Sequence, residues 1–200
     1  GDANDCSPDY LITHVYNNDS ESKPLSPFEG SNADKGSKSP HFASGVVRGV
    51  GNMLRDVGFK GEIHWNEWGA SWFPYAPARE TENEAAFIAK TMAEVSQEAD
   101  YFAYWNLTDI YDHAGFGVEA FHGYYGLLNR DGLRKPSYCA HQLLSRLGDR
   151  VLPVSVQGGD RLLNGLVTRH DQGYRLLVYA YQDPHEESAL PEGEAVHVEV

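Results

Sequence analysis

The sequence predicts an α/β protein whose parallel sheet is followed by the start of an antiparallel β domain. Up to about residue 150, three strand-like segments alternate with three helical patterns, and such alternation is typical of βαβ units. After Asp149 the pattern changes to alternating apolar and polar side chains, which indicates antiparallel strands. Hydrophobic residues make up 41% of the 200 residues, so a substantial core is expected.

The first strand is expected at residues 9–16 (DYLITHVY). Residues 17–40 follow, rich in Ser, Asn, Gly and Pro and without periodicity, and they are predicted to form a loop. Loops of this length are usually functional or disordered. Residues 42–59 return to near-helical spacing of apolar side chains, although their glycines weaken the helix.

The second strand is expected at residues 61–70 (GEIHWNEWGA), which place one glutamate between two tryptophans. Residues 81–99 then give the clearest helical pattern, because small and aliphatic side chains recur on one face. At its start, Thr81 and Glu84 match a capping box, in which each side chain bonds to the backbone N–H of the other residue.

The third strand is expected within residues 100–112 (DYFAYWNLTDIYD). The segment 135–148 (KPSYCAHQLLSRLG) follows it and is expected to form a helix, with Pro136 near its start and Gly148 just past its end. Three strands and three helices fall short of a closed barrel or a wide sheet. The chain is therefore expected to be a piece of a larger protein.

The tail contributes the predicted antiparallel strands. Two strands are expected around a turn at residues 171–173, and residues 195–200 (AVHVEV) alternate at period two. The predicted organisation is an α/β part over residues 1–150 and the start of a β domain over residues 151–200.

Composition excludes several classes of function. The chain has 29 acidic and 16 basic residues and a net charge of −13, which argues against a nucleic-acid partner. No apolar run approaches the roughly 20 residues that span a bilayer, so no membrane partner is expected. The first ten residues are polar and show no secretory signal. Cys6 and Cys139 form no metal spacing and no disulfide framework, which favours free thiols and a cytoplasmic location.

Ligands of parallel α/β proteins bind at the carboxyl ends of the strands, so the polar and aromatic residues there are the candidate site. Rings that stack on apolar sugar faces, together with carboxylates that accept from hydroxyls, suit a carbohydrate. For Asp112 and His113, which follow the third strand, a position on a solvated loop is the alternative. The candidates are His14, Tyr16, Asn66, Glu67, Trp105, Asp109, Asp112 and His113.

Each candidate also has a structural alternative. Glu67 is an unusual residue beside buried tryptophans, because a buried carboxylate is costly unless it is paired, and a Lys or Arg partner would make it structural. His14 has the alternative of a core histidine, Trp105 has the alternative of core packing, and Trp65 is expected to pack in the core. The histidines lack the spacing of a metal site, so neither a metal nor another cofactor is expected.

The segments ITHVY, GEIHWNEWGASW, ETENEAAFIAK, YFAYWNLTDIYD and FHGYYGLLNRDGLRKPSYCAHQLLSRLG follow one another along the chain. In this order they resemble glycoside hydrolase family 39, which contains β-xylosidases and α-L-iduronidases, and ITHVY resembles the family's strand-six His-x-Tyr. The resemblance covers roughly residues 9–150, and the tail is similar to the family's β-sandwich extension. It implies that residues 1–150 are the C-terminal part of a (β/α)8 TIM barrel, about strands six to eight, and that residues 151–200 are part of the sandwich.

The resemblance also implies a retaining hydrolase that uses two glutamates in a double displacement. Glu67 matches the family's nucleophile at the end of strand seven. The general acid/base belongs to an Asn-Glu pair at strand four, and neither Asn66-Glu67 nor Asn83-Glu84 matches it. The acid/base is therefore expected outside this chain, and the chain alone is expected to be inactive, self-associated or joined by the missing barrel segments.

The remaining site residues also take roles from the resemblance. His14 and Tyr16 would hold the sugar or the nucleophile, and Trp105 would form a wall of the subsite. Family xylosidases usually have two acidic residues where this chain has Asp112 and His113, a departure that bears on sugar specificity. A β-xylosidase is the leading expectation; an arabinosidase or uronidase of the same family, or a non-catalytic carbohydrate-binding or interaction module, remain alternatives.

Overall fold

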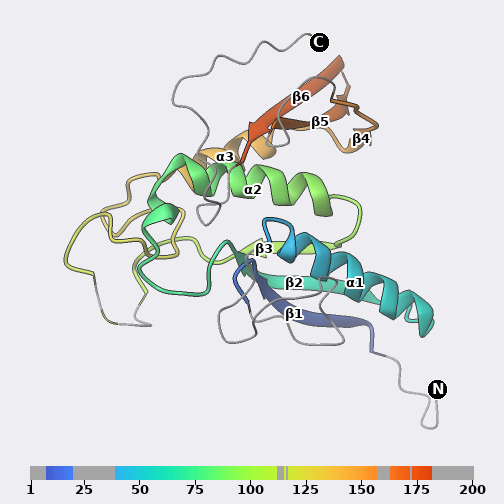
Figure 1. The fold of residues 1–200 in the computed structure, drawn as a ribbon, viewed down its shortest axis with the longest axis horizontal. Helices are drawn as coiled ribbons and strands as arrows, with labels where there is room; N and C mark the ends of the chain where they lie inside the picture. The colour runs from blue at the N-terminus through green and yellow to red at the C-terminus, as the bar shows by residue number, and fades with distance from the viewer. Residues whose placement is uncertain are drawn as a thin grey trace.

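The structure, a computed structural model, describes residues 8–19, 39–111, 115, 117–156, 163–171 and 173–181. The described residues form two three-stranded sheets, with helices between them (Figure 1). The first sheet has the order β1-β2-β3 and all its strands are parallel; the second has the order β4-β5-β6 and is antiparallel. The strands are β1 (Tyr10–Tyr16), β2 (Glu62–Gly69), β3 (Tyr101–Tyr104), β4 (Arg150–Leu152), β5 (Leu163–His170) and β6 (Gly173–Ala180).

Helices follow the strands of the parallel sheet in the predicted alternation. Helix α2 lies between the two sheets, and α1 lies beside it over the parallel sheet (Figure 1). The mixed α/β fold and the change to antiparallel strands in the tail are therefore confirmed. The helical elements are α1 (Phe42–Asp56), the 3-10 helix η2 (Pro77–Glu80), α2 (Glu82–Val95) and α3 (Pro136–Leu144).

One face of the parallel sheet forms the core with α1 and α2. Val15, Trp65 and Trp68 from the strands are buried together with Val47 of α1 and Phe87 of α2. Burying a large side chain of this kind stabilises the fold by about 1.5–3 kcal/mol relative to exposure. This packing explains why α1 forms in spite of its glycines, since tertiary burial outweighs local propensity.

A β-bulge in β2 decides which face of the sheet carries Glu67. In the β1–β2 pairing, Thr13 lies opposite Trp65 and His14 lies opposite Glu67, so Asn66 is an extra residue. Side chains normally alternate between the faces of a strand, and one inserted residue shifts that alternation. As a result Trp65 and Trp68 both point into the core, while Glu67 lies on the other face.

The other face of the parallel sheet is open among the residues that the structure describes. Tyr10, Ile12 and Tyr101 are each more than half exposed on it. The ring of His64 lies between the two tyrosines, 5.2 Å from Tyr10 and 4.4 Å from Tyr101 between ring centroids. Parallel sheets are normally covered on both faces, so this row of rings is an unusual surface.

The predicted capping box at the start of α2 is only half correct. The Thr81 hydroxyl accepts a hydrogen bond from the Asn83 N–H at 3.3 Å, as expected for an N-cap. Glu84 does not bond back to Thr81; it is buried, and its Oε1 accepts from the Tyr104 hydroxyl at 2.8 Å. A buried carboxylate needs donors, and Tyr104 of β3 supplies one across the helix–sheet interface.

The tail forms a hairpin as predicted. Strands β5 and β6 pair up to the His170–Gly173 end, which confirms the turn, although Gln172 itself lies outside the described residues. Strand β4 was not predicted and pairs with the end of β5. The alternating segment 195–200 also lies outside the described residues. No helix in the described part of the chain is long and apolar enough to cross a membrane.

Candidate active site

Glu67 lies near the carboxyl end of β2, on the open face of the parallel sheet. Its Oε1 accepts a hydrogen bond from the Tyr16 hydroxyl at 2.7 Å, and its Oε2 lies 3.5 Å from Nδ1 of His14. Both partners come from β1, because the register places His14 directly opposite Glu67. The Glu67 side chain keeps 23% of its surface exposed, so the carboxylate is oriented on one side and open on the other.

Tyr16 is the better buried of the two partners. Burial raises the pKa of Tyr16 far above its ordinary value, and the neighbouring Glu67 carboxylate raises it further. Tyr16 therefore stays protonated and acts as a hydrogen-bond donor to Glu67 at any physiological pH. Gly69 packs beside the Tyr16 ring, where an added Cβ would lie 3.3 Å from Cε1.

A second carboxylate, Asp19, lies in the same neighbourhood and was missed from the sequence. Its Oδ2 accepts the backbone N–H of Tyr16 at 2.8 Å. Burial raises the pKa of Asp19, and the charge of Glu67 also raises it. The only local signal is its position just after β1, because residues 17–40 show no periodicity in the sequence.

The other candidates lie around Glu67 in different settings. Asn66 is the exposed bulge residue beside Glu67. Trp105 follows β3, donates its backbone N–H to the Trp68 carbonyl at 3.1 Å and packs edge-on against Tyr111 at 5.4 Å between centroids. A cis peptide bond joins Trp105 to the next residue. Asp112 and His113, by contrast, lie outside the described residues.

The structure corrects the prediction that Asp109 belongs to the ligand site, because this residue is not placed to bind a ligand. Its side chain is fully buried, and Oδ2 lies 2.7 Å from Nζ of Lys135. Its Oδ1 accepts the Gly126 N–H at 2.7 Å. With both oxygens bound inside the protein, Asp109 is structural. The substrate-binding prediction failed because the sequence could not show that Lys135, 26 positions further on, would be buried against it.

Lys135 itself joins three segments behind the site. Besides Asp109, its ammonium contacts Oε1 of Glu80 at 2.9 Å and the Tyr124 carbonyl at 3.1 Å. The same Oε1 of Glu80 accepts the Gly123 N–H at 2.8 Å. The buried Lys135 ammonium thus connects η2, through Glu80, to two parts of the segment between β3 and α3, one at Asp109 and one at Tyr124.

Arg79, the neighbour of Glu80 on η2, is a second buried cation. Its guanidinium donates to the Gly123 carbonyl at 2.6 Å and lies 4.3 Å from the centre of the Tyr125 ring. Burial raises the pKa of Glu84, and the Arg79 charge opposes that rise. Arg79 therefore contributes positive charge close behind the sheet end that carries Glu67.

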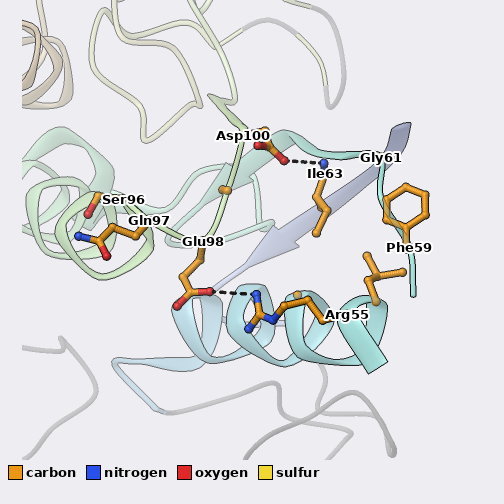
Figure 2. Close-up of a pocket in the computed structure, with 11 residues that line it drawn as sticks. Arg55, Phe59, Gly61, Ile63, Ser96, Gln97, Glu98 and Asp100 are labelled. Carbon is orange, nitrogen blue, oxygen red and sulfur yellow. Dashed lines mark hydrogen bonds and ion pairs between the residues drawn. The ribbon is translucent and has the colours of Figure 1, made fainter. Parts of the chain in front are cut away.

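A separate pocket lies at the opposite end of the sheet (Figure 2). It is bounded by the Arg55–Glu98 ion pair, at 3.9 Å, and by Asp100, whose Oδ2 accepts the Ile63 N–H at 3.0 Å. Phe59 lies on the chain that leads into β2 (Figure 2). Because this pocket lies at the amino ends of the strands, the side associated with stability in parallel barrels, the Glu67 rim remains the candidate active site. No three metal-ligating side chains gather in the described ranges.

A carboxylate held by a tyrosine and a histidine at the carboxyl end of a parallel strand is an arrangement suited to a glycoside hydrolase, which works through carboxyl groups. The family model for glycosyl hydrolases family 39 matches residues 2–198. The chain belongs to this family.

Individual relatives agree with the family. The chain is 26% identical over 177 residues to a β-xylosidase of Caldicellulosiruptor saccharolyticus, covering 88% of this chain and 35% of that protein. It is 31% identical over 90 residues to a β-xylosidase of Geobacillus stearothermophilus, and the match covers 45% of this chain and 18% of that protein.

Solved structures share the fold. The GH39 enzyme of Xanthomonas axonopodis pv. citri is 27% identical with a TM-score of 0.71, over 90% of this chain and 34% of that one. A monomeric β-xylosidase of Caulobacter crescentus has the same TM-score at 24% identity, and the match covers 90% of this chain and 35% of that one. The chain thus spans about a third of the length of these relatives.

Proposed function

We propose that this protein is a retaining glycoside hydrolase of the β-xylosidase type, with Glu67 as its nucleophile. The observation that carries the proposal is the position of Glu67, whose carboxylate is held by Tyr16 and His14 and open on its other side. Membership of family 39 and the β-xylosidase names of the curated relatives support the reaction class and the sugar.

In this proposal the Glu67 carboxylate attacks the anomeric carbon, and the bond to the leaving oxygen breaks as an acid protonates that oxygen. Water then hydrolyses the glycosyl ester, and the acid, now a base, takes the water's proton. Tyr16 holds Oε1 throughout and keeps the carboxylate in one orientation. The exposed His14 and Asn66 contact sugar hydroxyls, and Trp105 forms one wall of the subsite.

The acid/base is proposed to lie outside this chain. Asp19 is a carboxylate that feels the charge of Glu67, but its Oδ2 accepts the Tyr16 N–H. Strands β1 to β3 are proposed to be strands six to eight of a (β/α)8 barrel within residues 1–150, and residues 151–200 part of a β-sandwich. The open sheet face around Tyr10 and Tyr101 and the coverage of a third of the relatives support this arrangement.

The test uses the full-length protein and the variant Glu67→Ala. Turnover of an aryl β-xyloside should fall by several orders of magnitude. Added azide should restore turnover by taking the place of the missing carboxylate and should give a xylosyl azide of inverted configuration. Glu62→Ala is the matched control, since Glu62 is exposed at the far end of the same strand. A near-wild-type rate for Glu67→Ala would remove the nucleophile assignment.

The sugar is tested with a panel of nitrophenyl glycosides on the same protein. The β-xyloside is expected to give the highest kcat/KM. A preference for an arabinoside or a uronide would keep the reaction and Glu67 but change the substrate, and residues Asp112 and His113 would then be the first positions to exchange. Binding of sugars without turnover of any glycoside would favour a non-catalytic module.

A further inference from the structure

We propose that Asp19 is a positioning residue for the nucleophile, because it fixes the backbone of Tyr16, whose hydroxyl holds Glu67. This inference rests on the proposed function and deepens it, since it adds a residue to the groups that orient the attacking carboxylate. Asp19 follows Tyr16 by three positions, just past the end of β1. It contacts no sugar in this proposal and acts through Tyr16.

Asp19 binds both polar backbone groups of Tyr16. Its Oδ2 accepts the Tyr16 N–H at 2.8 Å, and its own N–H donates to the Tyr16 carbonyl at 3.0 Å. The second bond is that of a turn, and the first closes the turn through an aspartate side chain. Because a residue has only two soft backbone dihedrals, bonds at both of its polar groups fix the direction in which the Tyr16 side chain leaves the strand.

The Tyr16 N–H needs this partner because β1 is an edge strand among the strands that the structure describes. The N–H of the next residue, Asn17, donates to the Gly69 carbonyl beside β1 at 3.0 Å. Successive N–H groups of a strand point to opposite sides, so the Tyr16 N–H points away from β2. A carboxylate is a strong acceptor for such a group, because the hydrogen bond is assisted by its charge.

From this fixed backbone the Tyr16 ring reaches across to β2. The ring packs beside Gly69, and its hydroxyl donates to Oε1 of Glu67 at 2.7 Å. Tyr16 is only 6% exposed, so the ring is enclosed and follows any rotation of its backbone. Since a hydrogen bond weakens steeply as its angle departs from linear, the orientation of the Glu67 carboxylate depends on the two bonds that Asp19 makes.

Asp19 also lies within electrostatic reach of the nucleophile. Burial raises the pKa of Asp19, the hydrogen bond from the Tyr16 N–H opposes that rise, and the charge of Glu67 adds to it. His14, which lies 3.5 Å from Glu67, acts on Asp19 with the opposite sign. Interactions between charges in a protein are short-ranged at physiological salt, so Asp19, Glu67, His14 and Tyr16 form one cluster at the end of β1.

The experiment compares Asp19→Asn and Asp19→Ala in the full-length protein, with the best substrate of the nitrophenyl glycoside panel. Asparagine keeps an oxygen that can accept the Tyr16 N–H, so kcat should stay within about threefold of wild type. Alanine removes the acceptor, and kcat should fall roughly 10-fold, the loss expected for one hydrogen bond to a charged group. KM should change by less than about twofold, because the contacts to the sugar remain. Asp56→Ala, at the exposed last residue of α1, should change neither constant.

A second pair of variants separates positioning from packing. In Tyr16→Phe no hydroxyl reaches Glu67, so adding Asp19→Ala to this variant should lower kcat by less than about twofold. If Asp19 only stabilised the end of β1, the alanine substitution would cost the same factor with and without the Tyr16 hydroxyl. Should Asp19→Ala fail to fold, Asp19→Glu takes its place in both comparisons, because it keeps the charge and displaces the acceptor by one methylene group.

The outcomes separate this inference from the proposed function. A loss of kcat that depends on the Tyr16 hydroxyl and is avoided by asparagine supports the positioning role. Unchanged kcat in Asp19→Ala, equal losses with and without the hydroxyl, or equal losses for asparagine and alanine would overturn that role while the wild-type protein remains an active glycosidase. A wild-type protein that hydrolyses no glycoside of the panel would instead overturn the proposed function, and the role of Asp19 with it.

Discussion

Lys135→Met should be among the most destabilising single changes in the chain. The Lys135 ammonium is fully buried within 2.7 Å of Asp109 and 2.9 Å of Glu80. Methionine fills a similar volume but carries no charge and no donor. The substitution would therefore leave Asp109, also fully buried, and Glu80, largely buried, as two carboxylates without their shared cation.

The magnitude follows from what remains after the substitution. Removing one partner of a buried ion pair costs about 3–5 kcal/mol, because the other charge stays buried and uncompensated. Here two carboxylates lose the same partner, so the upper part of that range is expected. The Gly126 N–H still bonds Asp109 and the Gly123 N–H still bonds Glu80, which keeps the loss from growing further.

The assay is equilibrium unfolding of the full-length protein in urea, with Lys60→Met as the control. Lys60 is exposed, so the same chemical change there should cost less than about 0.5 kcal/mol. Adding Asp109→Asn to Lys135→Met should recover part of the loss, because a neutral amide oxygen can still accept from Gly126. A loss below about 1 kcal/mol for Lys135→Met, or no recovery in the double variant, would refute the buried-cation argument.

Two further predictions concern Tyr16 and Glu94. Tyr16→Phe removes the donor to Glu67, and kcat with an aryl xyloside should fall roughly 10- to 100-fold, in line with about 1.5–3 kcal/mol for a hydrogen bond to a charged group; an unchanged kcat would contradict that role. Burial raises the pKa of Glu94, but the His41 hydrogen bond and the Lys90 charge outweigh it and lower the pKa to about 2. Because the pKa of Glu94 is lower in the folded protein, its ionised form stabilises the fold at pH values above its ordinary pKa of 4.5. This contribution of roughly 3 kcal/mol is lost as the pH falls toward 2. The stability difference between wild type and Glu94→Gln should therefore shrink over that interval in pH-dependent unfolding, and a constant difference would contradict the pairing.

The order of elements was predictable because it depends on local patterns. Apolar alternation at residues 9–16 and helical spacing at residues 81–99 determine strand and helix before any long-range contact is made. The position of Glu67 near a strand end was predictable for the same reason. Its hydrogen bond from Tyr16 and its contact with His14 were not, because they depend on which residue of β1 lies opposite it.

The sequence by itself determined the family, the alternation of strands and helices, and the candidate nucleophile, since these lie in contiguous segments. Only the tertiary structure decided where individual polar groups point. The bulge at Asn66 turns Glu67 away from the core although tryptophans flank it, and Asp109 is bound by Lys135 instead of facing a ligand. Glu84 likewise bonds Tyr104 rather than the helix start. A buried charge takes the nearest partner that folding brings to it, and that partner lies tens of residues away in the chain.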